Sequence, residues 1–122
     1  MIAAIEQRPG VKTEIWSWYF MRISGLILLF LALGHFFTTH ILHDVTSTNS
    51  AFIDGRWQNP LWRLYDWSLL ALGLFHGANG LRFIMDDYIQ VAWKRAATKA
   101  VVFGVIITLF AYGTITVLTF KA

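Results

Sequence analysis

The sequence predicts an all-α integral membrane protein in which three helices cross the bilayer. Of the 122 residues, 57% are hydrophobic and only 14% are charged, and the mean hydropathy is +0.54. Soluble domains carry about 25% charged residues. The apolar residues also gather into three runs that reach the roughly 20 residues a spanning helix needs. Membrane-spanning strands would instead show segments of about ten residues alternating in polarity, which the sequence lacks.

The three apolar runs cover about residues 16–42, 61–85 and 100–120, and each is expected to form one helix. At this length the chain, 1–122, is expected to be a single transmembrane domain. The linker from 43 to 60 is polar, contains the turn signal Asp54-Gly55 and ends on Pro60, which can begin the next helix. The linker from 86 to 99 is basic.

Lysine and arginine are unevenly divided between the two sides, and cytoplasmic segments are normally the richer ones. The richer side holds Arg8, Lys12, Arg22, Arg82, Lys94, Arg95 and Lys99, and the other holds Arg56, Arg63 and Lys121. This predicts a cytoplasmic N-terminus and an outside C-terminus. The net charge of +3 then reflects membrane topology and does not indicate a surface that binds nucleic acid.

The chain has no cysteine, so disulfides, thiolate metal sites and iron–sulfur clusters are excluded. Residues 1–15 have neither the apolar core of a signal peptide nor the acid-poor character of a transit peptide. We therefore expect a multi-pass protein of a prokaryotic cell membrane.

Polar residues inside a span are the functional candidates, because lipid makes them costly. Span one contains Arg22, Ser24 and His35, and span two contains His76, Asn79 and Arg82. Span three has only threonine and tyrosine hydroxyls, which can bond their own helix, so we expect a packing helix.

His76 lies in the middle of span two, with Gly73, Gly77 and Gly80 around it. Two interpretations are open. The glycines can be a small-residue packing site with the histidine bonded to a neighbouring helix. Alternatively, they leave flat space for a macrocycle whose iron the imidazole ligates.

His35 can be a packing histidine or a second ligand. It lies about 20 Å from Arg22 along its helix, and His76 lies about 15 Å from Asp86. This small offset in depth permits two haems without requiring them. Arg22 and Arg82 can reach the interface or pair with a buried anion such as a haem propionate. At the inner boundary Asp87 and Tyr88 can cap the span, or the phenol can donate a hydrogen bond to a quinone carbonyl.

Two segments together resemble a known family. WSWYFMRISGLILLFLALGH, residues 16–35, is similar to the helix of succinate:quinone oxidoreductase anchors in which Arg-x-[ST]-Gly precedes a histidine. LFHGANGLRFIMDDY, residues 74–88, is similar to their second helix, with its mid-helix histidine and terminal Asp-Tyr. The three spans and the topology fit the smaller, D-type anchor.

The resemblance implies a non-catalytic membrane subunit of complex II, which passes electrons from succinate to menaquinone or ubiquinone. Its partners would be a second hydrophobic anchor (C), an iron–sulfur subunit and a flavoprotein, and the whole complex can form a higher oligomer. His76 would ligate the iron of a haem b, with the other axial histidine from the C subunit, and His35 a second haem. The remaining residues of the implied haem and quinone sites are Ser24, Gly77, Gly80, Arg22, Arg82, Asp87 and Tyr88.

Three alternatives stay open: an anchor of a fumarate reductase, a cofactor-free structural membrane subunit, and a self-contained haem b electron carrier. The last usually supplies two histidine pairs from four helices of one chain, and this chain has three spans.

Overall fold

The computed structural model describes residues 9–121. Residues 1–8, with Arg8 of the topology argument, and Ala122 lie outside the described part. The described residues form helices and no strand. The elements in chain order are α2 (Pro9–Phe36), the π-helical turn η1 (Phe37–Ile41), the 3-10 turn η2 (Val45–Ser47), α3 (Ser50–Trp57), α4 (Pro60–Tyr88) and α5 (Ala92–Thr119).

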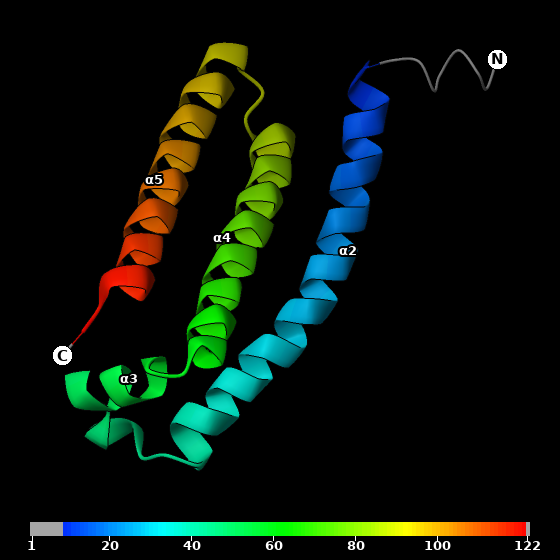
Figure 1. Ribbon diagram of the computed structural model, residues 1–122. Helices are drawn as coiled ribbons and strands as arrows, with labels where there is room; N and C mark the ends of the chain where they lie inside the picture. The colour runs from blue at the N-terminus through cyan, green and yellow to red at the C-terminus, as the bar shows by residue number, and fades with distance from the viewer. Residues whose placement is uncertain (1–8, 122) are drawn as a thin grey trace.

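The three long helices stand side by side in an up-down-up arrangement with α4 in the middle (Figure 1). The start of α2 and the α4–α5 loop lie at one end of the molecule, and α3 lies near the C-terminus at the other. We call these the inner and the outer end. Helix α4 packs against both α2 and α5, and its buried residues are Ala71, Ala78 and Met85.

Two helical segments, Lys12–Ile41 and Ala92–Thr119, are long and apolar enough to cross a membrane. Only 6% and 11% of their apolar windows are buried inside the molecule, so neither is the core helix of a soluble domain. Helix α4 is as long, with 29 residues, but it carries charged residues towards both ends. The expected all-helical fold is confirmed in the described residues, and two of the three expected spans meet the requirements of length and hydropathy for crossing a membrane.

The start of α4 at Pro60 is as predicted. The side-chain Oδ1 of Asn59 accepts a hydrogen bond from the backbone N–H of Leu61 at 2.9 Å, which caps the helix. The segment 86–99, predicted to link the second and third spans, is largely helical, because α4 continues to Tyr88 and α5 begins at Ala92. A helix can extend beyond an apolar span, so the predicted span boundaries stay a prediction.

The turn predicted at Asp54-Gly55 is wrong, because both residues lie within helix α3. Asn49 Oδ1 accepts from the backbone N–H of Phe52 at 2.9 Å and caps the start of the helix. Tertiary contacts then hold α3 on α4, since Asp66 of α4 accepts hydrogen bonds from Arg56 and Trp57 of α3 at 2.8–3.1 Å. These anchors outweigh the weak helix propensity of the glycine.

Arg63 joins three elements at the outer end. Its guanidinium donates to the carbonyl of Trp57 at 2.6 Å, and to the carbonyls of Leu118 and Phe120 at 3.2 Å each. The last two are carbonyls at the C-terminal end of α5, where no helical donor remains.

Outside the helices, the pKa of Asp44 lies below its ordinary value because the backbone N–H and then the hydroxyl of Thr46 donate to its carboxylate.

Helix α5 behaves as the expected packing helix. Hydroxyls of Thr108, Thr116 and Thr119 donate to carbonyls four residues earlier in their own helix. One hydroxyl has a different role, because Thr114 accepts a hydrogen bond from the indole of Trp67 on α4 at 3.0 Å.

Candidate functional site

His76 lies in the contact between α4 and α2. Its ring nitrogen Nδ1 is 2.8 Å from Oγ of Ser24, which lies on α2 and is only 2% exposed. Its Cε1 edge faces Gly25, where an added Cβ would come within 3.3 Å. Two consecutive residues of α2 therefore hold one edge of the imidazole.

The hydrogen bonds of Ser24 determine which ring nitrogen carries the proton. The hydroxyl has one hydrogen, and it donates this to the backbone carbonyl of Phe20 one turn earlier. Towards His76 the same oxygen therefore acts as acceptor, so Nδ1 carries the N–H. In a neutral imidazole the lone pair then lies on Nε2.

One face of α4 next to His76 is open. At Gly73 and at Gly77 an added Cβ would meet no atom within 4 Å, whereas at Gly80 it would meet the methyl of Met21 at 3.6 Å. Tyr88 extends this face towards the inner end, because it follows Gly77 by eleven residues (88 − 77 = 11), which is about three turns. Tyr88 is 82% exposed and lies at the last residue of α4, and its neighbour Asp87 is exposed as well.

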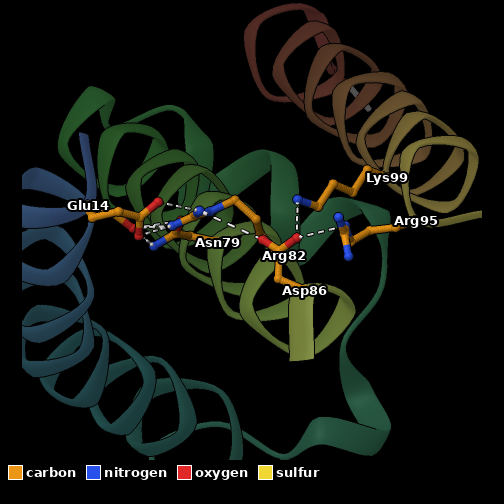
Figure 2. A network of polar contacts seen from close by, with 7 residues as sticks. Glu14, Asn79, Arg82, Asp86, Arg95 and Lys99 are labelled. Atoms are coloured by element: carbon orange, nitrogen blue, oxygen red, sulfur yellow. Dashed lines mark hydrogen bonds and ion pairs between the residues drawn. The ribbon is translucent and has the colours of Figure 1, made fainter. Parts of the chain in front are cut away.

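Arg82 is tied to α2 by a polar network (Figure 2). Its two terminal nitrogens donate to the carboxylate of Glu14 at 2.9 and 3.2 Å, and one of them also donates to Ser17 at 2.9 Å. Its Nε donates to the amide oxygen of Asn79 at 3.1 Å, and Asn79 in turn donates to Ser17 at 2.7 Å. Each of the three guanidinium nitrogens of Arg82 thus donates a hydrogen bond within the chain.

The same network continues to α5 through Asp86. Its carboxylate lies 2.6 Å from Nζ of Lys99 and 3.5 Å from Nε of Arg95, and 4.0 Å from Arg82 one turn earlier (Figure 2). The carboxylate therefore joins α4 to the start of α5. Surface pairs of this kind contribute little singly, but a connected set fixes the positions of all three helices at the inner end.

Arg22 is in a different situation. Its guanidinium carbon lies 4.0 Å over the ring of Trp18, one turn nearer the inner end, and the side chain is exposed. Among the described residues no carboxylate pairs with it. A cation stacked on an indole in this way remains able to bind an anion.

His35 lies near the outer end beside Asp66. Its buried Nδ1 is 3.5 Å from Asp66 Oδ1, which is longer than a hydrogen bond, and it has no hydrogen-bond partner among the described residues. The side chain as a whole is 41% exposed, so the opposite edge of the ring is the accessible one.

The predicted depths of the two histidines need correction. The contact with Gly25 places His76 level with that residue, and His35 follows it by ten residues (35 − 25 = 10), or about 15 Å along the helix. The sequence-based offset was too small because it counted from Arg22 and Asp86 as if they were level. They are not, since Arg82 already lies opposite Glu14.

Comparison with known proteins decides the family. Residues 5–113 match the family of succinate dehydrogenase/fumarate reductase transmembrane subunits. The chain belongs to this family.

Two relatives support the membership. One is the "succinate dehydrogenase hydrophobic membrane anchor subunit" of Archaeoglobus fulgidus, which is 30% identical over 97 residues, 80% of this chain and 82% of the relative. The other is "succinate dehydrogenase 2 membrane subunit SdhC" of Mycobacterium tuberculosis, 32% identical over 80 residues and 66% of this chain. The match spans only 55%, about half, of the mycobacterial protein.

The predicted resemblance to succinate dehydrogenase membrane anchors is therefore confirmed, and the D-type assignment stays a prediction. Among the predicted site residues, His76 contacts Ser24, and Gly77 follows His76 on the open face of α4. His35 lies about 15 Å further along α2, towards the outer end.

Sequence reasoning missed the contacts of Gly25, Ser17, Glu14 and Asp66. A signal for Gly25 was present, because it belongs to the quoted Arg-x-Ser-Gly element. Nothing in the sequence indicated the partners of the other three, since each depends on how two helices face one another.

Proposed function

We propose that the chain is a membrane anchor of a succinate:quinone oxidoreductase in a prokaryotic cell membrane. In this role it binds haem b, forms part of a quinone site and holds an iron–sulfur subunit with its flavoprotein at the inner end. Support comes from the family, from the names of both relatives and from the two helices that are long and apolar enough to cross a membrane.

The observation that carries the haem proposal is the arrangement around His76. Ligation of haem iron needs a ring nitrogen with a free lone pair, and the proton on Nδ1 leaves it on Nε2. A macrocycle also needs space beside the ligand, and the positions of Gly73 and Gly77 are open. The residues present therefore fit a haem ligated by His76.

When bound, haem b supplies a site for one electron at a time. The residues of this chain would hold it and its surroundings. Nε2 of His76 would ligate the iron, and Arg22, which has no acidic partner in residues 9–121, would bind a propionate by its guanidinium. Because Glu14 already engages Arg82, we assign Arg82 to the contact between helices.

Quinone binding is assigned to the inner end of the open face. The Tyr88 hydroxyl can donate a hydrogen bond to a quinone carbonyl, and the carboxyl of Asp87 beside it can hold a proton for the reduced ring. A second anchor subunit would cover this face and would supply the second histidine that holds the haem.

We further propose three spans with a cytoplasmic N-terminus. Helix α4 would be the third span, since it lies between two helices that meet the requirements for spanning and is as long as they are. The inner end has the greater number of cations, as cytoplasmic ends do. The lysine and arginine residues described there are Lys12, Arg22, Arg82, Lys94, Arg95 and Lys99.

The test is His76→Ala in the purified complex, read by the reduced-minus-oxidised absorbance spectrum. We expect the b-type bands of one haem to be lost, because no other side chain nearby on α4 is a good ligand for low-spin haem. The matched control is His40→Ala, which removes a histidine that stacks on Phe36 and is exposed.

The alternative is a cofactor-free structural anchor in which Gly73 and Gly77 pack against a partner helix. It predicts no b-type spectrum in either variant or in the wild-type complex. An unchanged spectrum in His76→Ala would likewise refute the assigned ligand. The spectrum does not distinguish succinate oxidation from fumarate reduction, and the family includes transmembrane subunits of both enzymes.

A further inference from the structure

The Arg-x-Ser-Gly element of α2 contacts the histidine of another helix. Within the sequence this element precedes His35 on the same helix, which invites a link between the two. In the structure Ser24 and Gly25 instead touch His76 of α4, while His35 lies about 15 Å further along α2.

The contact constrains the imidazole in two ways. The hydrogen bond between Nδ1 and Ser24 Oγ, at 2.8 Å, fixes the ring orientation and the tautomer. The bare backbone of Gly25 then allows the Cε1 edge to approach α2 so closely that a methyl group would lie 3.3 Å from it. That distance is tighter than nine in ten real Cβ contacts, so an added methyl group would require the ring to shift by a few tenths of an ångström.

Burial makes this arrangement specific to the serine. Ser24 is 2% exposed and is the buried polar side chain of the described core. Its hydroxyl proton is already donated to Phe20, so the oxygen can act towards the ring only as an acceptor. Removing this acceptor leaves the Nδ1–H without its partner in the protein.

We propose that Ser24 and Gly25 are positioning residues for His76, which set the tautomer, the plane and the basicity of an axial haem ligand. This inference rests on the proposed function, in which His76 ligates haem b. Residues that hydrogen-bond the second nitrogen of a ligating histidine fix its ring and raise its basicity. A more basic ligand stabilises ferric over ferrous iron, so the hydrogen bond to Ser24 lowers the midpoint potential of this haem.

The decisive variant is Ser24→Ala in the assembled complex, which removes the acceptor and almost no volume. We expect the haem to be retained, its midpoint potential to become more positive, and its loss on dilution in detergent to be on the order of ten-fold faster. Ser17→Ala is the matched control. It removes another α2 serine that accepts hydrogen bonds from α4, here from Asn79 and Arg82, and it leaves the contacts of His76 unchanged.

A second variant, Gly25→Ala, tests the orientation of the ring and also decides the matter if Ser24→Ala does not assemble. The added methyl displaces the ring edge while leaving Ser24 in place. We expect a changed largest g value in the low-spin ferric EPR spectrum, because this value depends on the angle between the two axial imidazole planes. Its control is Gly104→Ala on α5, where an added Cβ meets nothing within 4 Å.

The inference would be overturned if both Ser24→Ala and Gly25→Ala kept the midpoint potential and the EPR spectrum of the wild-type haem. An equal shift in Ser17→Ala would overturn it too, since the effect would then come from general loosening of the helix pair. These outcomes are distinct from failure of the proposed function, which would show as a haem spectrum that survives His76→Ala.

Discussion

Arg22 and Arg82 look alike in the sequence, one near the inner end of each span, but their surroundings separate them. Arg82 donates to Glu14, Ser17 and Asn79, so moving it to a ligand would break contacts between α2 and α4. Arg22 rests on the face of Trp18 with no carboxylate described near it. An arginine in this position can gain a bidentate anion partner without losing one, which is the physical reason to prefer it as a propionate ligand.

A residue-level prediction concerns Tyr88→Phe. We expect quinone reduction by the complex to weaken several-fold, because one hydrogen bond to a ligand contributes about 0.5–1.5 kcal/mol. Succinate oxidation with a soluble dye as acceptor should stay near wild type. The control is Tyr112→Phe on α5, also highly exposed at 74%. If both assays fall together in Tyr88→Phe, the phenol supports assembly and does not contact quinone.

At the level of elements, α2 and α4 approach each other through small residues. Gly25 allows contact with His76, and Gly34 allows contact with Tyr65, whose hydroxyl would lie 2.6 Å from an added Cβ. That hydroxyl also donates to the carbonyl of Leu31. Without a hydrophobic driving force in lipid, such close packing and interhelical hydrogen bonds are what hold helices together.

The element-level prediction is that Gly34→Ala lowers the thermal stability of the complex. The methyl group would overlap the Tyr65 hydroxyl, so the ring must move and give up its bond to Leu31. Overpacking of this kind costs about 1–3 kcal/mol. Thermal unfolding in detergent provides the measurement, with Gly104→Ala as the open-space control. Equal melting temperatures for the two variants would show that the crossing of α2 and α4 is looser than described.

At the level of the whole molecule, the side-by-side arrangement of α2 and α4 places the two span histidines at different depths. His76 lies level with Gly25, whereas His35 lies about 15 Å nearer the outer end, beside Asp66. A single haem cannot use both as ligands across that distance. The carboxylate of Asp66 is held by Arg56 and Trp57, and it lies 3.5 Å from Nδ1 of His35, which is too far for a hydrogen bond.

The whole-molecule prediction is a second haem on His35. Pyridine haemochrome quantitation against flavin should give about two haems per flavin in the purified complex. His35→Ala should then reduce the ratio to about one and leave the haem on His76 in place. One haem per flavin in the wild type would assign His35 to packing at the outer end.

The sequence by itself determined the membrane class, the long apolar helices, the start of α4 at Pro60 and the family, because these depend on composition, on local capping and on motifs along one chain. It also identified His76 from the cost of a histidine in lipid.

The tertiary structure decided which residues face one another. Asp54-Gly55 is helical because Asp66, on the next helix, anchors α3 through Arg56. The depth of His35 relative to His76 followed from the register of α2 against α4, which no span boundary encodes. The same register brought Ser24 to His76 and so placed the proton on Nδ1, because the direction of a hydrogen bond is set by both of its partners.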